Sequence, residues 1–386
     1  MDTSNTQTQL PGAAMSKQPT QSIHVLMISA RADHGGGPRH IELLLRSLPA
    51  WVTVYIACPE DDPYWARFKE LVNGRLFRIP HRRFGLLQAA RLALHVRRTG
   101  IQVIHTHGKG AGIYGRIASL LGGAPCVHTP HGIHVGSYGP SLRSLYLRYE
   151  NISARCVEHL IHVSPEEQDQ ARELGLWRAI PASVIVNGVP SHTPDSSQQL
   201  RRQARRRLGF PESSPVVATV SRFDYQKNMG DAYLIAKAMP HIRFLWIGTG
   251  EEIAALQRRA AADGVRNLHF LGRMDAPLNA LAAADAYLST SRWEGLPLAV
   301  LEAMSLGIPS VLSNVIGHKN LIENHGAGLL YPAGDIGSAV SALTRVLDGP
   351  ELHRTLAESA RSAQLGIFSS TTVASQTASL YKGLAS

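Results

Sequence analysis

Short apolar runs alternate along the chain with longer segments in which hydrophobic side chains recur at helical spacing. A run of about four to eight apolar residues bounded by turn signals is typical of a buried strand, and recurrence every three or four residues is typical of a helix. Strands that alternate with helices predict a parallel sheet covered by helices, which is an α/β fold. In the first half of the chain the predicted strands are Ile23–Ser29, Val52–Ala57, Val103–Thr106, Cys126–Thr129, His159–Ser164 and Ser183–Val186.

The alternation stops at Pro190–Gln199, a polar segment, and then restarts. We predict two Rossmann-like, doubly wound parallel-sheet domains that face each other, over residues 22–190 and 201–386, joined by a linker at 191–200. The last helix is a candidate to pack back on the N-terminal domain. Residues 1–21 are polar and predict a disordered leader. The predicted strands of the second domain are Val216–Ser221, Arg243–Ile247, Leu268–Leu271, Ala286–Ser289 and Pro309–Leu312.

The net charge is +10, and from Leu71 to Tyr149 the sequence contains basic residues, Arg116 among them, but no Asp or Glu. Such a surface attracts polyanions or anionic lipid. The basic helix at about Pro80–Arg98 is a candidate for docking on a membrane, with an ordinary core helix as the alternative. The basic segment Arg201–Arg207 is interpreted as a solvated helix face. The candidate membrane and acceptor residues are Arg82, Arg83, Arg91, Arg97 and Arg98.

Several classes of protein are disfavoured by composition. The sequence has no run of about 18 apolar residues, so no spanning helix is predicted. It has no recognition helix, aromatic platform or zinc finger, so a nucleic-acid partner is not expected. The three cysteines, Cys58, Cys126 and Cys156, form no CxxC pair, which argues against a disulfide framework or a zinc knuckle.

The most informative chemistry lies in Ser291–Gly307, where Glu294 stands on a turn beside Gly295 and Glu302 follows eight residues later. We predict an amphipathic helix here with a proline in its first turn. The start of a helix offers unpaired amides to an anion, and flanking carboxylates accept hydrogen bonds from hydroxyls. A ligand that has phosphate between two polyol groups would suit this arrangement, and a nucleotide sugar is such a ligand. Glycoside hydrolysis fits less well, because hydrolases place their two carboxylates on opposite sides of the scissile bond.

Two further loops follow predicted strands. One of these loops follows Val216–Ser221 and carries Arg222 and Lys227. A planar guanidinium that can donate two parallel hydrogen bonds, together with a compact ammonium charge, suits a diphosphate. Gly35-Gly36-Gly37 allows the backbone to approach a bound group closely. The isolated Gly248-Thr-Gly250 lacks the third glycine of a dinucleotide fingerprint and is interpreted as a structural turn.

Histidines gather at the ends of two predicted strands, in His105-Thr-His107 and His128-Thr-Pro-His131-Gly-Ile-His134. We predict no metal site there, because such sites usually recruit a carboxylate or thiolate and this stretch supplies no carboxylate. His131 is the best candidate for contact with a substrate. His105 and His128 lie within strands and are interpreted as packing residues.

Together these motifs resemble the retaining, nucleotide-sugar-dependent glycosyltransferases of the GT-B fold, family four, with its "glycosyltransferase group 1" domain. The likeness runs from about Ile23 to Ala363. Its most specific part is the E-x7-E element Glu294-Gly-Leu-Pro-Leu-Ala-Val-Leu-Glu302. The other matching elements are Ser221-Arg222 with Lys227, Gly35-Gly36-Gly37, Thr129-Pro-His131-Gly and Ile185-Val-Asn187-Gly188-Val189.

The resemblance implies a role for each matching residue. Arg222 and Lys227 would bind the donor diphosphate, assisted by the amides of Gly295 and Leu296. Glu294 would bind the transferred sugar and Glu302 the nucleotide ribose. His131 would contact the sugar near the reacting carbon. The expected catalytic residues are His131, Arg222, Lys227 and Glu294, and the expected donor-binding residues are Gly36, Gly37, Arg222, Lys227, Arg273, Glu294, Gly295, Leu296 and Glu302.

The resemblance also implies no cofactor beyond the nucleotide-sugar co-substrate and no metal, and the sequence has no Asp-x-Asp motif. In many bacterial relatives the acceptor is a saccharide on a lipid. We therefore expect a lipid-linked acceptor, an anionic membrane as partner, and a cytoplasmic protein peripheral to the inner face of the cell membrane. Two alternatives stay open: a nucleotide-sugar 2-epimerase of the same architecture, and a catalytically inactive homologue that binds membranes.

Overall fold

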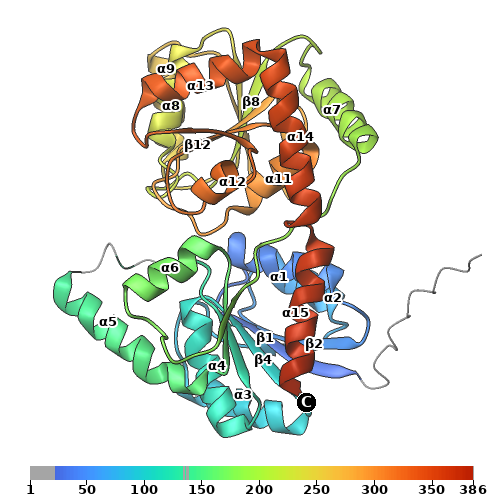
Figure 1. The fold of residues 1–386 in the computed structure, drawn as a ribbon, viewed down its shortest axis with the longest axis vertical. Helices are drawn as coiled ribbons and strands as arrows, with labels where there is room; N and C mark the ends of the chain where they lie inside the picture. Colours follow the sequence, from blue (N-terminus) through green and yellow to red (C-terminus); the bar gives the residue numbers. More distant parts are fainter. Residues whose placement is uncertain (1–21, 134, 136–138, 386) are drawn as a thin grey trace, which may run out of the picture.

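The computed structural model describes residues 22–133, 135 and 139–385, so the predicted leader at 1–21 and His134 lie outside the described residues. Two α/β domains lie one above the other, each built on a parallel sheet (Figure 1). This architecture confirms the predicted fold class. Among the described residues no helix has the length and apolar character needed to cross a bilayer.

The N-terminal domain has a seven-stranded parallel sheet in the order β3-β2-β1-β4-β5-β6-β7. Consecutive connections reverse direction between β1 and β4, which is where ligand crevices form in such sheets. Its strands are β1 (Ile23–Ser29), β2 (Val52–Cys58), β3 (Leu76–Arg78), β4 (Val103–His107), β5 (Cys126–Thr129), β6 (His159–His162) and β7 (Ala182–Val184). Its helices are α1 (Gly36–Ser47), α2 (Tyr64–Leu71), α3 (Leu86–Arg98), α4 (Lys109–Gly122), α5 (Pro140–Ser153) and α6 (Pro165–Glu173), with the short 3-10 helix η1 (Ala154–Cys156).

The C-terminal domain has a six-stranded parallel sheet in the order β10-β9-β8-β11-β12-β13, with the reversal between β8 and β11. Its strands are β8 (Val216–Val220), β9 (Arg243–Ile247), β10 (Leu268–Gly272), β11 (Ala286–Ser289), β12 (Ser310–Ser313) and β13 (Gly328–Tyr331). Its helices are α7 (Pro194–Leu208), α8 (Met229–Ala238), α9 (Ile253–Ala262), α10 (Leu278–Leu281), α11 (Leu298–Leu306), α12 (Lys319–Glu323), α13 (Ile336–Asp348) and α14 (Pro350–Gly366).

The chain crosses between the domains twice. Val189 follows the N-terminal sheet, and its amide donates to the carbonyl of Phe368, at the end of the C-terminal domain. The last helix, α15 (Ser370–Ala385), then packs on α1, β1 and β4 of the N-terminal domain (Figure 1). On it, the Tyr381 hydroxyl forms a buried hydrogen bond of 2.6 Å with His105 Nδ1.

Two sequence-based interpretations around the crossing are wrong. The helix α7 begins at Pro194, inside the predicted linker, because Thr193 caps it by accepting from the Ser196 amide and proline suits the first helical position. Arg205, assigned to a solvated face, is fully buried and pairs with Asp285 at 2.8 Å. The edge strands β3 and β13 were not predicted, because each is short and only partly buried.

Candidate active site

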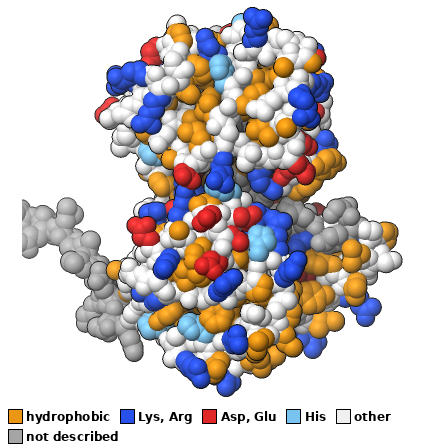
Figure 2. Space-filling model, turned by 180° about the vertical axis from the view of Figure 1, so that it is seen from behind, with side chains coloured by type: hydrophobic (Ala, Val, Ile, Leu, Met, Phe, Trp, Pro, Cys, Tyr) orange, Lys and Arg blue, Asp and Glu red, His pale blue; other side chains and the backbone are white. Residues whose placement is uncertain are grey.

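A cleft of about 720 Å³ lies between the domains. It is lined by residues at the carboxyl ends of β1, β8, β9 and β11 and at the starts of α1 and α11. Positively and negatively charged side chains lie close together where the two domains meet (Figure 2). The basic residues of the Pro80–Arg98 region are not among its lining residues. The predicted donor-binding and catalytic residues all line it: Gly36, Gly37, His131, Arg222, Lys227, Arg273, Glu294, Gly295, Leu296 and Glu302.

The glycine loop places the N-terminus of α1 against the cleft. The helix begins at Gly36, so two of the three predicted loop glycines belong to its first turn. The first amides of a helix have no intrahelical acceptor, so those of Gly36 and Gly37 are available to an anion. A Cβ atom built on either residue would meet nothing within 4 Å. Packing within the protein therefore does not require glycine here, and the open space beside both residues leaves room for a bound group to approach the backbone closely.

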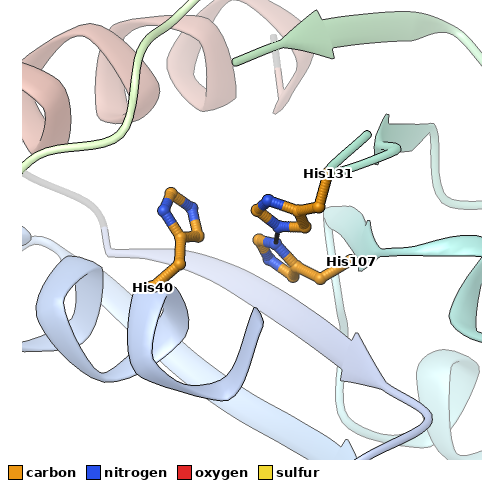
Figure 3. A group of neighbouring side chains, drawn as sticks. All are labelled: His40, His107 and His131. Carbon is orange, nitrogen blue, oxygen red and sulfur yellow. Dashed lines mark hydrogen bonds between the residues drawn. The ribbon is translucent and has the colours of Figure 1, made fainter. Parts of the chain in front are cut away.

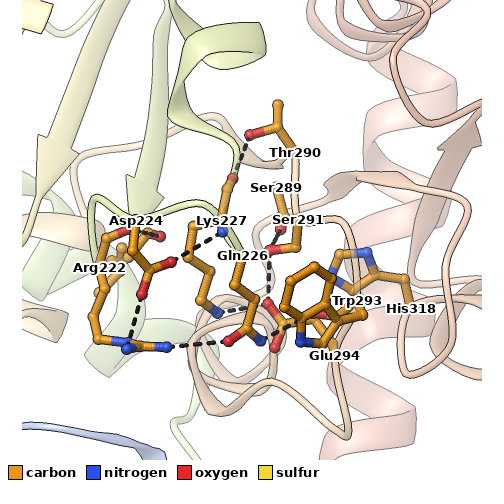
Figure 4. A network of polar contacts seen from close by, with 12 residues as sticks. Arg222, Asp224, Gln226, Lys227, Ser289, Thr290, Ser291, Trp293, Glu294 and His318 are labelled. Carbon is orange, nitrogen blue, oxygen red and sulfur yellow. Dashed lines mark hydrogen bonds and ion pairs between the residues drawn. The ribbon is translucent and has the colours of Figure 1, made fainter. Parts of the chain in front are cut away.

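The loop between β8 and α8 carries the two predicted cations, and both are engaged by neighbouring side chains (Figure 4). Arg222 pairs with Asp224 at 2.8 Å and donates to Gln226 Oε1 at 3.1 Å. Lys227 Nζ lies 2.5 Å from Glu294 Oε1. An entering anion must therefore share these cations with protein carboxylates. The Arg222 side chain is about half exposed, which leaves it free to turn towards a ligand.

Glu294 lies in the turn after β11, held by Lys227 and by the Ser291 hydroxyl at 2.6 Å. Burial would raise the pKa of Glu294, but the charge of Lys227 and these two hydrogen bonds outweigh burial and lower it. The carboxylate is thus ionised at neutral pH. An ionised carboxylate only accepts hydrogen bonds, so Glu294 suits a ligand that donates from hydroxyl groups.

The helix after this turn differs from the prediction. Pro297 caps α11, the helix itself begins at Leu298, and the amides of Gly295 and Leu296 lie in the turn before it. The expected amphipathic helix is wrong, because α11 is buried on nearly every side. Its two polar residues are buried as well: Ser305 donates to the Glu302 carbonyl at 2.7 Å, and Glu302 faces the cleft.

Glu302 pairs across the cleft with Arg39 of α1, at 3.2 Å. Sequence reasoning missed Arg39, because its importance depends on this contact with a residue 263 positions away. Burial raises the pKa of Glu302, and Arg39 partly offsets that rise. A second ion pair between the domains, Arg67–Asp275 at 3.1 Å, lies on the same cleft.

Three imidazoles meet on the N-terminal side of the cleft: His40 from α1, His107 at the end of β4, and His131 after β5 (Figure 3). Their candidate ligand atoms lie within 4.8 Å of one another, and His107 Nδ1 is 3.1 Å from His131 Nε2. Burial lowers the pKa of all three, to about 4 for His40, so they are neutral at pH 7. An all-imidazole set suits zinc or copper rather than magnesium.

The backbone fixes the position of His131. Its φ of 56° lies in the left-handed region, which is uncommon for a residue other than glycine. The next amide, that of Gly132, donates to Glu167, and the second oxygen of this carboxylate accepts from the Val163 amide at 2.8 Å. The predicted packing residues His105 and His128 are buried in their strands, hydrogen-bonded to Thr129 and Thr106.

Two facing doubly wound domains with a polar cleft between them form the GT-B architecture. The family model described as "Glycosyl transferases group 1" matches residues 201–363, and that described as "Glycosyltransferase Family 4" matches residues 34–192. The chain belongs to this glycosyltransferase family and is an enzyme of the hexosyltransferase type.

Named relatives are bacterial. The UDP-Gal:alpha-D-GlcNAc-diphosphoundecaprenol alpha-1,3-galactosyltransferase of Escherichia coli is 35% identical over 262 residues, covering 65% of this chain and 67% of that protein. The O-antigen biosynthesis glycosyltransferase WbnH of Escherichia coli is 24% identical over 335 residues, covering 86% and 92%. Among solved structures, Anabaena Alr3699/HepE in complex with UDP and glucose superposes with a TM-score of 0.80 at 19% identity, covering 94% of this chain and 100% of that one.

Proposed function

We propose that this enzyme is a retaining, metal-independent glycosyltransferase that moves a sugar from a nucleoside-diphosphate sugar to a lipid-linked saccharide in bacterial surface-polysaccharide assembly. The observation that carries the proposal is the convergence of Arg222, Lys227, Glu294 and Glu302 on one cleft beside the N-terminus of α1. Two cations and helix amides suit a diphosphate, and the two carboxylates suit hydroxyls on either side of it.

The chemistry follows from these positions. Arg222 and Lys227 bind the diphosphate and stabilise the negative charge that grows on it as the glycosidic bond breaks. Glu294 accepts hydrogen bonds from the transferred sugar, Glu302 from the ribose, and neutral His131 contacts the sugar near the reacting carbon. As the bond between the sugar and the diphosphate breaks, the acceptor hydroxyl oxygen attacks the face that the leaving group vacates and its proton passes to the departing diphosphate, so configuration is retained and no covalent nucleophile is assigned. Closure of the domains excludes water.

The names of the relatives support the finer parts of the proposal. The Escherichia coli relative at 35% identity is named for a UDP-galactose donor and a diphosphoundecaprenol-linked acceptor, and WbnH is named for O-antigen biosynthesis. A lipid-linked acceptor would place this chain on the inner face of the cell membrane in the cytoplasm. The basic residues Arg82, Arg83, Arg91, Arg97 and Arg98 would attract anionic lipid there.

The first experiment measures binding of UDP, GDP and ADP by calorimetry and thermal shift, with EDTA or with Mg²⁺ or Mn²⁺. We expect one nucleoside diphosphate to bind and stabilise the enzyme in EDTA, by about 2.7 kcal/mol at a hundredfold excess over Kd. Failure to bind any of the three, or binding only with a divalent ion, would contradict the proposal. Incubation with donor alone then tests the epimerase alternative, which predicts a new sugar nucleotide without acceptor. Turnover with a lipid acceptor would rule out the inactive homologue.

Arg39→Met is expected to change the pH dependence of nucleotide binding. The ribose hydroxyls donate to ionised Glu302, so affinity falls as pH drops through the pKa of this carboxyl. Burial raises the pKa of Glu302, and the charge and hydrogen bond of Arg39 partly offset that rise. Removing Arg39 therefore raises the pKa of Glu302 further. As the solution is acidified, the variant then loses affinity for the nucleotide at a higher pH than the wild type does. Calorimetry from pH 5 to pH 8 measures this shift.

The matched control is Arg46→Met, on the same helix. Arg46 is about half exposed and pairs with Glu42 at 3.0 Å, whereas Glu302 pairs with Arg39. Arg46→Met should therefore lose affinity for the nucleotide at the same pH as the wild type. If the wild type and Arg39→Met lose nucleotide affinity at the same pH, Glu302 does not bind the nucleotide as an ionised carboxylate.

A further inference from the structure

We propose that α5 and the exposed end of α4 form an interfacial docking surface that inserts apolar side chains into an anionic lipid bilayer. The inference rests on the proposed function, because it names the surface through which the enzyme meets a lipid-linked acceptor. It is separate from the arginines of the Pro80–Arg98 region, which attract a membrane but contribute no insertion by themselves.

The helix α5 exposes an apolar stripe to solvent, defined by Leu142, Leu145, Tyr149 and Ile152. Positions three, seven and ten residues after the first fall within an arc of about 80° when a helix turns by about 100° per residue. Leu145 and Ile152 are each 65% exposed. Another side of α5 packs into the domain through Tyr146 and Leu147. A helix that is apolar on both sides has a second face that needs a partner.

The end of α4 extends this surface. Leu120 and Leu121 are exposed, and α4 is joined to α5 by the buried ion pair Arg116–Glu150 at 2.6 Å. Six of the fifteen large exposed hydrophobic side chains among the described residues lie on α5 and the end of α4. Hydrophobic and basic side chains adjoin on the right of Figure 2, the side on which α5 lies in that view. This concentration separates the patch from the scattered apolar residues of an ordinary surface.

The charges around the stripe select an anionic lipid surface over a second copy of the chain. Arg143 and Arg148 are exposed on α5, where they line a surface pocket together with Glu173 of α6. Between Val72 and Tyr149 the sequence has no acidic residue, and Glu150 is buried against Arg116. A symmetric dimer through the stripe would bring α5 against its own copy, and neither α5 nor the end of α4 contributes an exposed carboxylate to such a contact. Phospholipid headgroups supply the missing negative charge, and acyl chains accept the leucines.

Vesicle co-sedimentation tests the surface, using phosphatidylglycerol/phosphatidylethanolamine vesicles and pure phosphatidylcholine vesicles. The variant Leu142→Ser/Leu145→Ser/Ile152→Ser should partition onto the anionic vesicles at least about tenfold more weakly than the wild type. Arg143→Gln/Arg148→Gln should weaken binding to anionic vesicles and reduce its dependence on salt. The control is Leu365→Ser, a leucine of the C-terminal domain that is also 65% exposed, which should bind like the wild type.

Each outcome bears on the docking surface separately from the chemistry. Wild-type partitioning by the triple serine variant would overturn the proposal, as would a concentration-dependent dimer that the variant abolishes in sedimentation velocity. Unchanged binding of UDP, GDP or ADP and an unchanged Tm show that the variant is folded, so that loss of vesicle binding supports the surface. A wild type that binds nucleotide but no vesicle would refute the docking surface and leave the glycosyltransferase proposal intact. A wild type that binds vesicles but no nucleotide would contradict the proposed function and leave the docking surface intact.

Discussion

Lys227→Ala is expected to lower kcat by about 10²–10³, the scale of losing one preorganised donor to a developing negative charge. The ammonium lies beside Glu294 at the cleft, on the loop that also carries Arg222. Its attraction to the diphosphate grows as the glycosidic bond breaks, so its loss affects turnover more than donor binding. Steady-state transfer assays with saturating donor and acceptor measure kcat, and calorimetry with the nucleoside diphosphate measures binding.

The matched control is Lys237→Ala. Lys237 lies on α8 in the same domain, about half exposed and paired with Asp263 at 2.7 Å, and its removal should leave turnover unchanged. Lys227→Ala has a second signature, because the Lys227 charge is one of the causes that lower the pKa of Glu294. Without it, that pKa rises and activity is lost at a higher pH on the acid side. Turnover within threefold of the wild type would remove Lys227 from the chemistry.

Much of the fold follows from the sequence because both sheets are parallel and buried. A strand covered on both faces must be almost continuously apolar, and β1 and β9 have that pattern. The same physics explains the omissions. The edge strand β3 has three residues, none of them fully buried, so no apolar run marks it. Helix α7 was missed although Thr193 and Pro194 are start signals, because its polar composition favoured a linker.

The candidate site was predictable where it depends on loops that follow strands. Arg222, Lys227 and Glu294 come after β8 and β11, whose carboxyl ends meet at the edge of one sheet. Contacts between distant elements left no signal in a single sequence. Arg39 and His40 occupy successive positions in α1, yet Arg39 reaches Glu302 and His40 packs on His131. The Arg39–Glu302 pair forms only when the two domains face each other, and the His40–His131 contact forms only when α1 and the loop after β5 meet in the folded N-terminal domain.

Arg116 shows how a residue type can mislead when its partner is distant in sequence. Within the acid-free stretch from Leu71 to Tyr149 we took it for part of a basic surface, which is wrong. The side chain is 5% exposed and pairs with Glu150, the residue that ends this stretch, at 2.6 Å. The Glu150 charge outweighs burial and raises the pKa of Arg116. The pair fastens α5 to α4 instead of contributing to the surface potential.

Glu150→Gln is therefore expected to lower the free energy of unfolding of the N-terminal domain by about 3–5 kcal/mol, because it leaves the Arg116 guanidinium buried without its counter-charge. Urea unfolding followed by intrinsic fluorescence and circular dichroism measures the change. The control is Glu158→Gln, an exposed carboxylate beyond η1, which should change the unfolding free energy by no more than about 0.5 kcal/mol.

The double variant Arg116→Met/Glu150→Met separates the charge from the packing. If the cost of Glu150→Gln comes from an uncompensated buried cation, replacing both partners by apolar side chains of similar volume should recover most of the lost stability. It should also keep α5 in place, so vesicle binding survives in the double variant and weakens in Glu150→Gln. A loss below about 1 kcal/mol in Glu150→Gln would show that water reaches Arg116 and that the ion pair is not what holds α5 against α4.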